Sequence, residues 1–183
     1  MENLILQNNG LIVKVHFKSS PENESELTYP EKDFSFEKEA LKAQIHDEVL
    51  VCFESSKGDG FIKSDLASLK EELVYNKLNK LILNKSLDPN EIYVIIPPCL
   101  TFSNIEISKE EALEIRKLGY APCCKGTSGK LYLDFLLLNV MQLLKVGIPF
   151  KNIKTVNIDT FENDEIFYSK KRGDEKYNLV EIF

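Results

Sequence analysis

Two histidines and four cysteines are the side chains of this sequence best suited to nucleophilic or metal chemistry. His46 stands in the segment AQIHD, and Cys52 follows shortly after it in the apolar run VLVCF. A base close to a thiol is the arrangement that activates a cysteine nucleophile. We therefore take His46 and Cys52 as candidate catalytic residues. The alternative is that Cys52 belongs to the core and that His46 is a surface or partly buried histidine.

The remaining thiols do not form a recognisable framework. Cys99 follows an apolar run, and Cys123 and Cys124 are adjacent, so that no CxxC pair of the kind used in zinc or redox sites is present. The chain starts without the basic and apolar order of a secretory signal, and we expect a cytoplasmic protein with reduced cysteines. His16 lies in an apolar run, where a structural role is expected.

A second candidate site is the basic cluster Lys170, Lys171 and Arg172, which follows the segment FYS. Lys171 and Arg172 are the candidate ligand-binding residues, for a small anion; the alternative is a solvated strand end. The whole chain is acidic, with a formal net charge of -6 and a pI near 5.1. Nucleic acid and anionic membranes are therefore not expected as partners, because phosphate contacts need clustered positive charge.

The elements that must position these residues follow from hydrophobic periodicity. Leucines and a valine spaced three and four apart predict a helix over 133–144, which Gly147 ends, and a similar pattern predicts a long helix over 66–82. The segment SKEE predicts a capping box at Ser108 for a helix that ends at Gly119. Apolar runs predict strands at 11–17, 49–53, 92–96, 153–158 and 166–168, and a glycine-containing turn is expected at 55–60.

Alternation of helices with fully apolar strands predicts an α/β fold. At 183 residues, one domain over 1–183 is expected, with residues 1–40 forming a strand and a polar, irregular loop. The chain lacks a run of eighteen or more apolar residues, so that no membrane association is expected.

The order of segments also resembles a known family. IPPCLTFSNIEIS, a short helix, LDFLLLNVMQLLKVGIPFKNI and DTFENDEIFYSKKRGDEKYNLVEI resemble the bacterial laccase-domain family, also called the YfiH-type polyphenol oxidase family. The resemblance covers roughly residues 64–183 and is most specific at Asn139, Gln142, Gly147, the FYS segment and Arg172. It implies a single layered α/β/β/α domain with mixed sheets, shortened here on the N-terminal side, and zinc-dependent chemistry on purine nucleosides.

The departures from the family pattern concern the metal site. The family's ligands are a histidine in a QxHG-like segment, a cysteine in ADC and a histidine in HAGWRG. Here AQIHD is similar to the first segment, with His46 as the ligand, while ADC and every tryptophan are absent. A second register places Phe53 or Glu54 at the second histidine, and neither register restores three ligands. Zinc catalysis needs three protein ligands and an open position, so that zinc is expected only if the family site survives.

Three hypotheses remain open. The first is a divergent family member whose zinc-dependent site is lost or altered, with weak nucleoside binding at most. The second is an active enzyme of the purine nucleoside phosphorylase or deaminase type. The third is a non-catalytic protein that self-associates, as a homodimer, through apolar surface uncovered by the missing N-terminal segment.

Overall fold

A computed structural model describes residues 2–24, 27, 31–37 and 39–183. Residues 25, 26, 28–30 and 38 lie outside the described residues, and they fall in the segment for which an irregular loop is expected. Within the described part, this segment includes a short 3-10 helix, η1 (Pro21–Glu24), and a two-residue strand, β3 (Phe34–Ser35).

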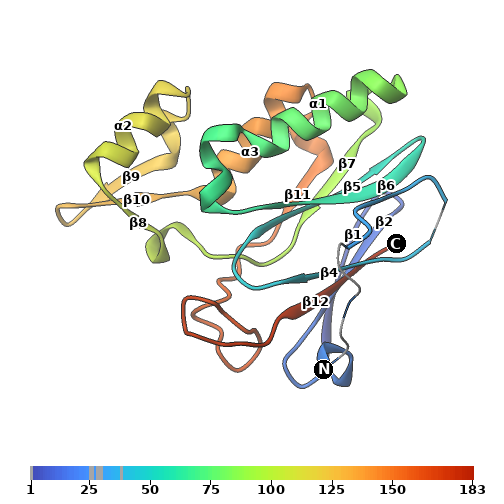
Figure 1. Cartoon of the computed structure of the whole chain (residues 1–183), viewed down its shortest axis with the longest axis horizontal. Coiled ribbons are helices and arrows are strands. Elements are labelled where there is room, and N and C mark those ends of the chain that lie inside the picture. The colour runs from blue at the N-terminus through green and yellow to red at the C-terminus, as the bar shows by residue number, and fades with distance from the viewer. Residues whose placement is uncertain (1, 25–26, 28–30, 38) are drawn as a thin grey trace.

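A five-stranded sheet forms the centre of the structure (Figure 1). Its strands, in spatial order, are β11 (Ile153–Thr155), β7 (Tyr93–Ile96), β5 (Val49–Ser55), β6 (Gly58–Ser64) and β3. β11 and β7 are parallel and the other pairs are antiparallel, so that the sheet is mixed. The apolar runs predicted at 49–53 and 92–96 are thus confirmed as strands, and both are buried because the sheet is covered on two sides.

One side of this sheet packs against a second, antiparallel sheet (Figure 1). Its strands, in spatial order, are β1 (Asn3–Asn8), β2 (Leu11–His16), β12 (Asn178–Ile182) and β4 (Leu41–Ile45). The interior between the sheets contains apolar side chains from both, among them Val13, Leu50, Cys52, Ile95 and Val180.

The other side of the five-stranded sheet is covered by helices, with the larger apolar cluster between them (Figure 1). These are η2 (Leu66–Glu71), α1 (Leu73–Lys85) and α3 (Phe135–Val146). The single helix expected over 66–82 is wrong, because Glu72 interrupts it with a left-handed φ of 45°. The Glu72 carboxylate holds this conformation by accepting hydrogen bonds from the Tyr120 hydroxyl and the Lys145 ammonium.

The start expected at Ser108 and the end expected at Gly147 are confirmed, whereas the helix expected from 133 begins at Phe135, and the one expected to end at Gly119 ends at Lys117. Asp134 caps the N-terminus of α3, and Gly147 ends it with a φ of 108°. The Ser108 capping box opens α2 (Lys109–Lys117). α2 packs on a small antiparallel sheet of β8 (Glu106–Ile107), β10 (Lys130–Leu133) and β9 (Cys124–Thr127). Short 3-10 helices complete the connections: η3 (Pro89–Glu91), η4 (Phe102–Asn104), η5 (Ala121–Cys123) and η6 (Phe150–Asn152).

The C-terminal segment differs from the sequence-based prediction. The strand expected over 166–168 is wrong, and that over 153–158 ends at Thr155 as β11. Between β11 and β12 the backbone follows an irregular path that side chains hold in place. At Tyr168, the Asn178 side chain replaces a partner strand, since its amide accepts from the Tyr168 N–H and donates to the Tyr168 carbonyl.

The glycine-containing turn expected at 55–60 is shorter than predicted. Gly58, Asp59 and Gly60 belong to β6, which pairs with β5 from Ser55 onward. At Gly60, a Cβ atom would lie 2.6 Å from the Phe53 ring, so that this position of the strand favours glycine.

The α/β fold class with layered, mixed sheets is confirmed. In the part of the chain that the structure describes, no helix is both long and apolar enough to cross a bilayer.

Candidate functional site

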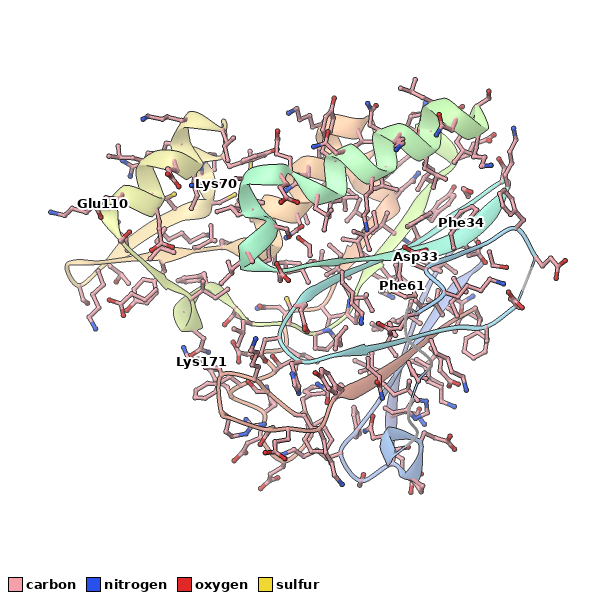
Figure 2. The ribbon with its side chains drawn as sticks, in the orientation of Figure 1. Asp33, Phe34, Phe61, Lys70, Glu110 and Lys171 are labelled. Carbon is pink, nitrogen blue, oxygen red and sulfur yellow. The ribbon has the colours of Figure 1, made fainter. Side chains whose placement is uncertain are left out.

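A cavity of about 390 Å³ lies where the β4–β5 turn meets the C-terminal loop, residues 156–177 between β11 and β12. Its apolar wall contains Leu100, Ile105 and Phe135, the first residue of α3. Polar and charged side chains surround this wall: His46, Asp47, Glu48, Asp65, Lys170 and Lys171. Figure 2 shows Lys171 between the C-terminal loop and the segment that follows β7.

Asp47 organises this site by joining the β4–β5 turn to the C-terminal loop. Its Oδ1 accepts a hydrogen bond from the Thr160 hydroxyl at 2.8 Å. Its Oδ2 accepts from the Ser169 hydroxyl and from the Lys171 backbone N–H, each at 2.9 Å. Because both carboxylate oxygens hold protein donors, Asp47 has little capacity left to act as a base or a metal ligand.

His46 borders the cavity but is held by its neighbours. The side chain is 6% exposed, and its Nε2 lies 2.5 Å from the Lys176 carbonyl oxygen. A carbonyl accepts hydrogen bonds, so that Nε2 carries the proton and the lone pair of the neutral ring lies on Nδ1. The ring stacks on Tyr177, with a centroid separation of 4.1 Å.

Cys52 is placed elsewhere, in the core between the two sheets. The side chain is fully buried, and burial raises the pKa of its thiol far above the ordinary value. Cys52 is absent from the lining of the cavity that His46 borders. This placement favours a core role over a nucleophilic one.

The two candidate anion-binding residues also make internal contacts. The Arg172 guanidinium donates to Asp174 at 2.8 Å and to the carbonyls of Phe161 and Phe167 at 2.7 and 2.5 Å. The Lys171 ammonium donates to the Asn104 carbonyl at 2.6 Å, while still lining the cavity. Arg172 thus stabilises the C-terminal loop. In contrast to Lys171, Lys170 has no hydrogen bond or ion pair from its ammonium group within the described residues.

Two polar residues of α3 that contribute to the family resemblance are buried. The Gln142 Oε1 accepts from the Tyr75 N–H at 3.0 Å, which satisfies a donor in the first turn of α1. The Asn139 amide donates to the Phe135 carbonyl at 2.8 Å, whereas its Oδ1 has no partner among the residues that the structure describes. Gln142 therefore joins α3 to α1, whereas the Asn139 hydrogen bond lies within α3, whose first residue, Phe135, stands in the cavity wall.

Comparison with known proteins identifies the family. The sequence model described as "multi-copper polyphenol oxidoreductase laccase" matches residues 66–178, more than half of the chain. The protein therefore belongs to this laccase-like family. No curated protein sequence matches it.

Three solved structures share the fold. The YfiH protein of Bacillus licheniformis has a TM-score of 0.73 at 18% identity over 82% of this chain. The YlmD protein of Geobacillus stearothermophilus has a TM-score of 0.73 at 21% identity over 81%. The Neisseria meningitidis protein NMB0706, of the family DUF152, has a TM-score of 0.78 at 14% identity over 100%. The alignments span 61%, 58% and 99% of those chains, respectively.

The side chains present do not fit the metal that the family name or the resemblance implies. A multi-copper centre relies on several histidines, and this chain has two. One is His46 and the other is His16. The His16 Nδ1 atom lies 3.1 Å from the Ser20 hydroxyl, and its Nε2 atom lies 2.9 Å from the Glu181 carboxylate. Within the described residues, no cluster of three or more His, Cys, Asp or Glu side chains is arranged to hold a metal ion.

Sequence reasoning identified His46 and Lys171 but missed the residue that joins them. Asp47 stands directly after His46, and its partners Thr160 and Ser169 are 113 and 122 residues away. The sequence shows an acidic residue at the turn between two apolar strands. This pattern could have marked Asp47 as a candidate, but it does not reveal partners that lie so far along the chain.

Proposed function

We propose that this protein is a divergent laccase-domain family member that has lost metal-dependent catalysis and keeps the cavity as a weak binding site. The observation that carries the proposal is that, among the described residues, no cluster of three or more His, Cys, Asp or Glu side chains is arranged to hold a metal ion. Nε2 of His46 is occupied by the Lys176 carbonyl, and both oxygens of Asp47 are occupied by hydrogen-bond donors. Nδ1 of His46 could supply one ligand at most, whereas catalytic zinc needs three protein ligands and an open position.

A nucleoside is the ligand class we propose for the cavity, on the strength of the family resemblance. Its volume of about 390 Å³ lies within the range of small-molecule sites. The apolar wall offers a surface to the base, and the Lys170 ammonium offers a donor to the sugar hydroxyls. Because Phe135 is 4% exposed, little aromatic surface is open for stacking. We therefore expect binding in the range of about 1 mM.

Metal analysis and activity assays on the purified protein test this proposal. We expect far less than one zinc or copper per chain, and no phosphorolysis or deamination of adenosine, inosine or guanosine. The His46→Ala variant should match the parent protein in both measurements. Stoichiometric metal and turnover that His46→Ala abolishes together would contradict the proposal and support the enzyme hypothesis.

Nucleoside binding is tested separately by NMR chemical-shift titration with inosine. Shifts should map to the residues around Phe135 and weaken in Lys170→Ala. Lys151→Ala provides the matched control, because Lys151 is an exposed lysine of η6 outside the cavity lining. Equal titration curves for the two variants would show that the cavity is not the binding site.

A further inference from the structure

A second cavity, of about 520 Å³, lies between the four-stranded sheet and the C-terminal loop. Its walls include apolar side chains from three separate parts of the chain: Leu4, Phe17, Phe102, Ile158, Ile166 and Phe167. Its polar lining is Thr101, Asn157, Asp159, Glu162 and Asn163. Its lining shares no residue with that of the cavity around His46.

The charged groups of this cavity are carboxylates. Asp159 is 4% exposed, and within the described residues no cationic side chain pairs with it. Its oxygens accept hydrogen bonds from the Thr101 N–H and hydroxyl, the Asn104 amide and the N–H groups of Phe161 and Glu162. Burial by itself would raise the pKa of Asp159, but these hydrogen bonds outweigh it and hold the pKa below its usual value. A buried, ionised carboxylate therefore stands in the wall of the cavity.

Glu162 supplies a second, more accessible carboxylate. It is exposed, and its Oε1 accepts a hydrogen bond from the Asn104 amide at 3.1 Å, which orients the group. Among the described residues, no Lys, Arg or His lines the cavity. Three lysines of neighbouring segments contact other groups: Lys171 the Asn104 carbonyl at 2.6 Å, Lys125 the Asp134 carboxylate at 3.4 Å and Lys18 the Asp164 carbonyl at 2.7 Å.

We propose that this second cavity binds a small organic cation, with a protonated amine against the Glu162 carboxylate and an apolar body against Phe17, Phe102 and Ile158. Among the described residues, neither carboxylate has a hydrogen bond or ion pair with a Lys, Arg or His side chain, and the resulting negative potential favours a positive ligand over a neutral or negative one. The Phe102 ring is 37% exposed and contributes apolar surface to the ligand body, because the Lys125 ammonium already lies over the ring, 5.1 Å from its centroid.

The experiment uses 2-phenylethylammonium as the probe, with 2-phenylethanol and 3-phenylpropionate as neutral and anionic analogues of similar size. Chemical-shift titration of the full chain should show the cation binding most tightly, with shifts around Phe102 and Glu162. The Glu162→Gln variant keeps an oxygen for Asn104 while removing the charge, and should weaken binding by about fivefold at low salt.

Glu165→Gln is the matched control, because Glu165 is an exposed acid of the same loop that lies outside the cavity lining. It should bind the cation as the parent does. Equal affinity for the three probes, an equal loss in both variants, or shifts confined to the His46 cavity would each overturn the proposal.

Discussion

The Ser169 hydroxyl donates a hydrogen bond of 2.9 Å to the Asp47 carboxylate, across 122 residues of sequence. This contact, with those from Thr160 and the Lys171 N–H, attaches the C-terminal loop to the turn between β4 and β5. The loop has no strand partner of its own along much of its length. Its position therefore depends on a few polar side chains: the Asp47 carboxylate, the Arg172 guanidinium and the Asn178 amide.

Replacing Asp47 should loosen the C-terminal loop. Asp47→Asn places an amide opposite at least one donor, and we expect the free energy of unfolding to fall by about 1–3 kcal/mol. Urea unfolding measures the change. Asp164→Asn is the control, since Asp164 is an exposed residue of the same loop whose carbonyl, rather than its side chain, contacts Lys18. Identical unfolding midpoints for both variants would show that Asp47 does not hold the loop.

Acid should destabilise the protein in part through Asp159. Hydrogen bonds outweigh burial and hold the pKa of this carboxyl below its usual value, so that below the unfolded-state pKa of about 3.9 the unfolded chain binds more protons than the folded one. The contribution is fully present above that pH and is lost as the pH falls through the folded-state pKa. The unfolding free energy should therefore drop below about pH 4.

The Asp159→Asn variant tests the origin of that slope. It should be less stable than the parent at pH 7 and show a weaker loss on acidification, while Asp164→Asn keeps the parental slope. Some pH dependence of stability should remain in this variant because the pKa of Asp174 is also lowered. Hydrogen bonds from the Ser169 N–H and the Arg172 side chain outweigh the effect of burial on that carboxyl. A parental slope in Asp159→Asn would contradict the assignment.

Thiol reactivity distinguishes a core cysteine from a nucleophile. Burial, together with nearby carboxylates, raises the pKa of the Cys99 and Cys123 thiols to about 12. Burial alone raises the pKa of the Cys52 thiol still further. Cys124 is partly exposed. With a disulfide reagent at neutral pH, we expect slow modification of Cys124 in the folded protein and of all four thiols after unfolding.

Single-residue variants show which thiol reacts in the folded protein. Cys124→Ser should abolish the slow reaction of the folded protein, whereas Cys52→Ala and His46→Ala should leave its rate unchanged. Rapid labelling of Cys52 that slows in His46→Ala would revive the catalytic pair suggested by their proximity in sequence.

Gly147 should be intolerant of a side chain. Its φ of 108° lies in the left-handed region, and an added Cβ would sit 3.4 Å from the Pro89 side chain. Gly147→Ala should therefore cost about 1–2 kcal/mol of stability. Gly126→Ala is the control: its Cβ would have 3.7 Å to Leu131, and we expect no loss of stability there. Thermal unfolding of the two variants measures the difference.

Much of the fold was predictable wherever a local pattern determines the structure. The apolar runs of β5 and β7, the capping box of α2 and the glycine that ends α3 all carry their signals within a few residues. Features that depend on distant partners were not predictable. The helix break at Glu72 requires Tyr120 and Lys145, and the irregular path at Tyr168 requires the Asn178 side chain.

The candidate site shows the same limit. His46 was recognisable by its residue type and the segment around it, but the sequence does not reveal that its Nε2 meets the Lys176 carbonyl, 130 residues further on. Cys52 seemed close to His46 because the two are neighbours in sequence. The alternation of β5 places this side chain in the interior between the sheets instead.

The position of β12 has a consequence for how the protein folds during synthesis. This strand lies between β2 and β4 and pairs with both, although it follows them by more than a hundred residues. A ribosome-bound chain without residues 178–182 has a gap in the middle of this sheet, with two unpaired edges facing it. The helical side of the molecule can form as it emerges, while the second sheet must wait. A nascent chain that stops before Asn178 should therefore tend to pair, through these strand edges, with other nascent chains on the same mRNA.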